Sequence, residues 1–90
     1  MAYMGGSPYN MAREIAEGFV QLTERTCRSM NPQELVKLSH ELDRYSRELR
    51  GEAVAHLEAT ELQSRQRKLM RLRSALTVVG AYRQRARPTA

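Results

Sequence analysis

Five large side chains recur at alternating intervals of three and four residues near the middle of this 90-residue chain. We call them the leucine seam; they are Leu35, Leu38, Leu42, Tyr45 and Leu49. An α-helix makes one turn in about 3.6 residues, so this spacing places all five on one helix face, as in a coiled coil. The chain shows no strand pattern of alternating apolar and polar residues. The seam therefore predicts an all-α protein.

A well-defined helix start precedes the seam. Asn31 can cap a helix, Pro32 suits its first position, and Glu34 stands where a capping box places its carboxylate. Because the connection upstream is short, the helix before it is expected to be an antiparallel neighbour. That first helix is predicted from Asn10 to about Arg28, with apolar positions at helical spacing: Met11, Ile15, Phe19, Leu22 and Thr26.

A third helix is predicted from about Glu52 to Tyr82, because no glycine or proline interrupts this stretch before Gly80. Gly51 either ends the second helix or lies inside a continuous one, and the sequence leaves both arrangements open. The third helix carries an apolar stripe and a second strip well round from it, so its last turns are expected to touch two neighbours. The stripe comprises Leu62, Leu69, Leu72, Leu76 and Val79, and the strip comprises Ala75, Val78 and Tyr82.

Together these segments predict a helical hairpin plus a long third helix, in a three-helix arrangement. Residues 1–9 are expected to form a flexible N-terminus, 10–82 a single helical domain and 83–90 a basic flexible tail. So short a chain cannot comfortably cover this much apolar surface, and we expect a homodimer or a fold completed by a partner. The residues expected at that interface are Leu35, Leu38, Leu42, Tyr45, Leu49, Leu69, Leu72, Leu76, Val79 and Tyr82.

The charge is divided unevenly along the chain. The net charge is +5, yet residues 1 to 61 carry 7 basic and 10 acidic side chains, whereas residues 62 to 90 carry 8 basic and no acidic ones. Such asymmetry indicates an interaction surface for an acidic protein or for a nucleic acid. Interleaved aromatic side chains and a helix-turn-helix, which would favour nucleic acid, are not recognisable. The predicted basic patch comprises Arg65, Arg67, Lys68, Arg71 and Arg73.

One member of this patch stands apart. Arg65 lies in the middle of the apolar arc of the third helix, so we expect it to be paired or to bury its stem in an interface. The acidic and basic parts of the chain can also attract each other, within a protomer or across a dimer. Only the remaining positive charge would then be available to a partner.

Few groups in the chain suit metal or covalent chemistry. Cys27, His40 and His56 are too far apart in sequence for a helical or loop metal motif, so no metal site and no cofactor are predicted. Cys27 cannot form an internal disulfide and is interpreted as a packing residue. The chain start lacks a cationic stretch followed by an apolar run, and no long uncharged apolar segment follows. We therefore expect a cytoplasmic protein that makes no contact with membranes.

The run from Ser39 to Asp43, Ser-His-Glu-Leu-Asp, resembles the Ser-Gln-Glu-Leu-Asp signature of the small sporulation-regulatory phosphatases. Those proteins are helical hairpins that dephosphorylate an aspartyl-phosphate on a response regulator. The resemblance implies that Ser39 and Asp43 face the phosphorylated site, and that Asp43 helps to position a water for attack beside the partner's own metal. The same run is also an ordinary amphipathic helix, in which Asp43 would pair with Arg47 one turn on.

Three functions follow from these observations. The leading interpretation is a small non-enzymatic regulatory protein that binds another protein through amphipathic helices and modulates or inhibits it sterically. Under this interpretation no residue is catalytic. The alternative is an aspartyl-phosphate phosphatase acting on a response regulator, with Ser39 and Asp43 as its site. A nucleic-acid-binding accessory protein is the third.

Overall fold

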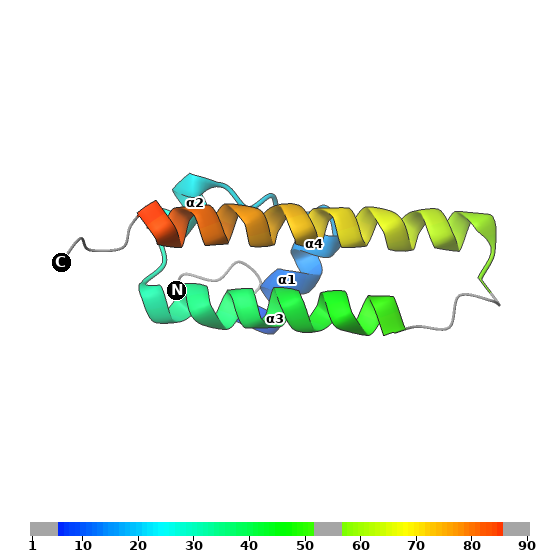
Figure 1. Ribbon diagram of the computed structural model, residues 1–90, viewed down its shortest axis with the longest axis horizontal. Helices are drawn as coiled ribbons and strands as arrows, with labels where there is room; N and C mark the ends of the chain where they lie inside the picture. Colours follow the sequence, from blue (N-terminus) through cyan, green and yellow to red (C-terminus); the bar gives the residue numbers. More distant parts are fainter. Residues whose placement is uncertain (1–5, 52–56, 86–90) are drawn as a thin grey trace.

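The computed structural model describes residues 6–51 and 57–85, which form helices and connections and contain no strand. The helices are α1 (Pro8–Glu17), α2 (Glu24–Arg28), α3 (Pro32–Gly51) and α4 (Ala59–Arg85). The two long helices, α3 and α4, run antiparallel side by side; α1 packs across both of them, and α2 packs against α4 (Figure 1). The predicted all-α class is confirmed, but the central hairpin joins α3 and α4 and not the first and second predicted helices.

The start of α3 is the one that the sequence predicts. The Asn31 side-chain oxygen accepts a hydrogen bond from the backbone N–H of Glu34 at 2.8 Å. In return, a carboxylate oxygen of Glu34 accepts one from the backbone N–H of Asn31 at 2.8 Å. This reciprocal capping box satisfies two N–H groups that a helix start otherwise leaves without partners.

The single helix predicted from Asn10 to Arg28 is wrong. Gly18 has φ of +86°, a left-handed conformation that ends α1, and the chain then runs through a non-helical connection to α2. The turn closes with hydrogen bonds from Gly18 N–H to the Ile15 carbonyl at 3.1 Å and from Phe19 N–H to the Glu14 carbonyl at 3.0 Å. Phe19, predicted on the apolar face, is consequently 77% exposed.

The outer boundaries of the helices also differ from the expected ones. Ser7 caps α1 by accepting a hydrogen bond from the Asn10 N–H at 3.1 Å, and α1 begins at Pro8; the N-cap and first-turn pair that these two residues offer in the sequence is confirmed, although the helix itself was expected from Asn10. The third predicted helix begins at Ala59 and extends to Arg85. Residues 8–9 and 83–85 are therefore helical, although they were expected in the terminal segments. Residues 1–5, 52–56 and 86–90 lie outside the described part of the chain.

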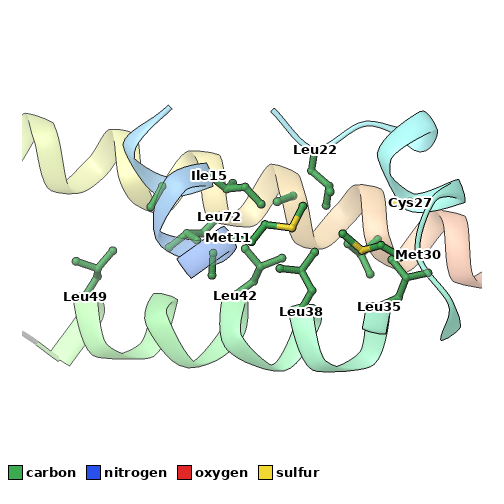
Figure 2. Packing of buried hydrophobic residues seen from close by; sticks show 14 residues of the cluster. Met11, Ile15, Leu22, Cys27, Met30, Leu35, Leu38, Leu42, Leu49 and Leu72 are labelled. Carbon is green, nitrogen blue, oxygen red and sulfur yellow. The ribbon is translucent and has the colours of Figure 1, made fainter. Parts of the chain in front are cut away.

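The core lies where α1 crosses the hairpin of α3 and α4 (Figure 2). Leu38 and Leu42 from α3, Met11 from α1 and Leu72 from α4 are completely buried there. Leu62, predicted on the apolar stripe of the third helix, is 37% exposed near the start of α4. In the described part of the chain, no helix is both long enough and apolar enough to cross a membrane.

Candidate protein-binding groove

The leucine seam forms the intramolecular core of the hairpin. Leu35, Leu38, Leu42 and Leu49 are at most 4% exposed. Tyr45 is half-buried, and its ring lies 4.3 Å from the guanidinium carbon of Arg13. In this fold the seam packs within the chain and presents little surface to another molecule.

The apolar residues predicted at an interface on the last helix divide into two groups. Leu72 and Val79 are buried in the core with the seam. Leu69, Leu76 and Tyr82 are half-buried and pack against the edge of the core. Of the whole predicted set, these three and Tyr45 are the side chains that a partner can reach.

The contact made by Arg65 explains why an arginine lies within the apolar arc of the last helix. Its Nε donates a hydrogen bond to the carbonyl oxygen of Leu49 at 2.8 Å. Leu49 belongs to the last turn of α3, whose carbonyl groups have no partner within the helix. The guanidinium thus completes the carboxyl end of α3 and carries a positive charge to the negative end of the helix dipole.

Arg71 completes the carboxyl end of α1 in the same way. Its Nη1 donates to the carbonyl oxygen of Ala16 at 3.0 Å, and the guanidinium passes over Gly18. A Cβ atom at Gly18 would lie 3.0 Å from the guanidinium carbon of Arg71, so a glycine leaves the room for this contact. Beside it, Lys68 Nζ lies 3.1 Å from a carboxylate oxygen of Glu17.

The predicted basic patch is therefore divided between different roles. Arg65, Lys68 and Arg71 hold α4 against the ends of α3 and α1. Arg67 and Arg73 are exposed, and neither side chain forms an ion pair with a residue that the structure describes. The expected attraction between the acidic and basic parts of the chain thus occurs within one protomer.

A hollow of about 260 Å³ lies between α3 and α4, and we call it the arginine groove. Its basic side chains come from both helices, and among the residues that the structure describes no carboxylate lines it. Arg50 is held at one edge because its Nη2 donates to the hydroxyl of buried Ser46 at 2.9 Å. The lining residues are Ser46, Arg50, Arg65, Gln66, Leu69, Met70, Arg73 and Leu76.

Sequence reasoning found only part of this groove. Arg65, Leu69, Arg73 and Leu76 are among the predicted residues, but in two separate sets, one basic and one apolar. Arg50 is not among the predicted site residues. Met70, which is 68% exposed, was not predicted at all. Only the pairing of α3 with α4 brings these side chains to one place.

The residues that the phosphatase resemblance implies lie on α3. Ser39 and Asp43 are both partly exposed, one turn apart. The Asp43 carboxylate accepts a close contact from Arg47 Nη2 at 2.6 Å, the pairing expected for an ordinary amphipathic helix. These residues do not line the arginine groove.

The described residues contain no cluster that could bind a metal ion, and their one cysteine is buried. No group of three or more His, Cys, Asp or Glu side chains within 6–51 and 57–85 could hold a metal ion, and His56 lies outside those ranges. Cys27 is fully buried. Burial raises the pKa of its thiol, and the nearby Glu24 carboxylate adds to the effect, so the neutral, weakly nucleophilic form is favoured.

The chain was compared with protein-family models, with curated proteins and with solved structures. None of the three comparisons found a match. The arginine groove is therefore interpreted from its own residues and geometry.

Proposed function

We propose that this chain is a small non-enzymatic regulatory protein that binds another protein through the arginine groove. The observation that carries the proposal is the composition of that groove, in which Arg50, Arg65 and Arg73 surround apolar side chains and no carboxylate of residues 6–51 or 57–85 takes part in the lining. The expected partner presents an amphipathic helix whose apolar face carries flanking Asp or Glu side chains. Its binding would block or reposition the partner sterically.

The apolar side chains and the arginines of the groove contribute to binding in different ways. Leu69, Leu76 and Met70 supply apolar area, which gains free energy when a partner removes it from water. The guanidiniums steer an acidic surface towards the groove and fix its orientation with paired hydrogen bonds to carboxylates. Arginine is enriched among the few positions that dominate binding energy, and arginine and methionine are both enriched at protein interfaces.

A charge reversal at Arg73 tests the groove. We expect Arg73→Glu to weaken partner binding by at least about tenfold, because a carboxylate would then repel the acidic partner at the groove. Arg83→Glu is the matched control, since both arginines are exposed on α4 and only Arg73 lines the groove. The wild-type chain and both variants would be immobilised, and proteins retained from a lysate of the source organism would be compared by mass spectrometry. The affinity of a retained protein, once purified, is then measured by calorimetry.

The comparison between the two variants decides the matter. The proposal requires a protein that the wild type and Arg83→Glu retain and that Arg73→Glu loses. Retention of the same proteins by all three baits, with equal affinities, would show that the groove is not the binding surface.

Aspartyl-phosphate phosphatase activity is the second candidate. Its support is that Ser39 and Asp43 are both partly exposed on one helix of an antiparallel hairpin. Its weakness is the ion pair that already occupies the Asp43 carboxylate. Under this proposal Asp43→Asn abolishes dephosphorylation of a response regulator, measured by loss of radiolabelled phosphate, while the helical content stays unchanged. If the wild-type chain does not accelerate the loss of phosphate, the candidate is rejected.

A further inference from the structure

Two guanidinium groups that line the arginine groove are both attached to the carboxyl end of α3. Arg65 donates from its Nε to the carbonyl oxygen of Leu49, and Arg50 is the next residue of α3. Arg50 is itself held by the hydrogen bond from its Nη2 to the hydroxyl of Ser46, a polar residue that is only 4% exposed. We call Arg50 and Arg65 the guanidinium pair.

The charges of the guanidinium pair are not neutralised by carboxylates in the described part of the chain. Neither arginine forms an ion pair there. By contrast, Arg44 and Arg47, the other arginines of α3, both pair with carboxylates of that helix. The negative end of the helix dipole offsets only about half an elementary charge. Two like charges held near each other repel, so an anion that binds to both relieves an unfavourable interaction.

The hydrogen-bond donors of the guanidinium pair suit a phosphoryl group better than a carboxylate. One donor of each arginine is engaged with α3, and a guanidinium has further N–H groups that remain for a ligand. A carboxylate carries one negative charge on two oxygens, which a single guanidinium can already bind with paired hydrogen bonds. A phosphorylated side chain carries a charge of about −1.5 to −2 and three acceptor oxygens, so it can accept from two guanidiniums at once.

We propose that the guanidinium pair binds a phosphorylated serine or threonine side chain of the partner protein. This inference rests on the proposed function, because the phosphoryl group belongs to the partner that occupies the arginine groove. Arg73 lies about 12 Å farther along the axis of α4 than Arg65, and so it can meet an Asp or Glu of the same partner. Phosphorylation of the partner then determines whether this chain binds it.

The surroundings of the guanidinium pair favour a phosphoryl group that is carried by a protein. Leu69, Met70 and Leu76 line the same hollow. A free phosphate ion would leave this apolar area in contact with water, whereas a phosphorylated segment with neighbouring apolar residues covers it. Arginine clusters are also a recurring means by which proteins recognise phosphorylated segments.

A titration with small model compounds tests the guanidinium pair directly. N-acetyl-O-phosphoserine amide is added at constant ionic strength, and the arginine Nε–H signals are followed by nuclear magnetic resonance. We expect the compound to shift the signals of Arg50 and Arg65. It should bind at least about tenfold more tightly than N-acetylaspartate amide, which carries a single negative charge. Equal affinities for the two compounds, or shifts confined to other arginines, overturn the proposal.

Matched substitutions separate the guanidinium pair from the general positive charge of the chain. Arg50→Gln and Arg67→Gln each remove one exposed arginine, but only Arg50 lines the groove. We expect Arg50→Gln to weaken binding of the phosphoserine compound at least about tenfold and Arg67→Gln to change it by less than about twofold. Circular dichroism checks that both variants keep the helical content of the wild type. Equal losses in the two variants would mean that the compound responds only to net charge, against the proposal.

One further variant tests whether a carboxylate of this chain already occupies the pair. Glu52 follows α3 and lies outside the described residues, and it is replaced by glutamine. The proposal requires the wild-type chain to bind the phosphoserine compound with Glu52 in place. Binding that is detected only in Glu52→Gln would identify the chain's own carboxylate as the occupant and would rule the proposal out.

Phosphatase treatment of the lysate tests the contribution of the partner. Proteins retained by the immobilised wild-type chain are compared between untreated lysate and lysate treated with a protein phosphatase. The protein that Arg73→Glu fails to retain should also be lost after the treatment. If the wild-type chain retains it equally from both lysates, the inference about phosphorylation fails while the proposed function stands. If no retained protein depends on Arg73, the proposed function fails, and the titration alone decides whether the guanidinium pair binds a phosphoryl group.

Discussion

Replacing Leu42 with aspartate is expected to abolish the folded state. Leu42 is completely buried on α3, where α1 and α4 both cover it (Figure 2). Loss of a buried leucine side chain alone costs about 2 to 5 kcal/mol, and a carboxylate left there without a partner adds to that cost. Small domains are stable by only about 5 to 15 kcal/mol, and a chain this short belongs to the lower part of that range.

The measurement is the thermal transition followed by far-ultraviolet circular dichroism. Leu42→Asp should show no cooperative transition, whereas Val36→Asp, on the exposed side of the same helix, should change the stability by less than about 0.5 kcal/mol. A Leu42→Asp protein that melts cooperatively near the wild-type temperature would mean that the seam is not the core of the monomer.

Two glycine-to-alanine substitutions are expected to change the free energy of unfolding in opposite directions. Gly18 has φ of +86°, a conformation that costs an alanine about 1 to 2 kcal/mol. The added Cβ would also lie 3.0 Å from the Arg71 guanidinium carbon and would push it away from the Ala16 carbonyl. Because a hydrogen bond from a charged donor contributes about 1.5 to 3 kcal/mol, Gly18→Ala is expected to destabilise the fold by about 1 to 2 kcal/mol from the backbone alone and by up to about 5 kcal/mol where the bond is lost as well.

Gly80 provides the matched comparison. It lies inside α4, and nothing stands within 4 Å of the place where its Cβ would be. Alanine is favoured over glycine in a helix interior by about 1 kcal/mol, so Gly80→Ala should stabilise the fold by up to that amount. Urea denaturation measures both free energies of unfolding. Equal effects of the two substitutions would show that Gly18 does not end α1 in the left-handed conformation.

Local sequence signals predicted α3 well, but the predicted hairpin joined the first and second helices, whereas the structure pairs α3 with α4. The capping box at Asn31 and the leucine seam fixed the start and the buried face of α3, because both depend on residues within a few positions of each other. The break at Gly18 was not predicted, since Phe19 and Leu22 continued the helical spacing beyond it. Gly18 was the local signal for the break, because local backbone hydrogen bonds close the turn there; the further hydrogen bond from Arg71 to Ala16, 55 residues away in sequence, has no local signal.

The candidate site was harder to predict for the same reason. Leu69 and Arg73 were singled out in the sequence, yet as members of different sets. The arginine groove exists only because α3 places Ser46 and Arg50 opposite them. Spacing also cannot distinguish an arginine that is free for a partner from one that completes a neighbouring helix, as Arg67 and Arg71 illustrate.

The contacts made by α4 set the order in which this protein can be completed during its synthesis. Arg65 closes the end of α3, Arg71 closes the end of α1, and Leu72 fills the space between those helices. All three belong to the last of the described helices in chain order. Until α4 has emerged from the ribosome, α1 and α3 hold two unfinished helix ends and an uncovered leucine face, so neither helix can complete its packing before α4 is synthesised.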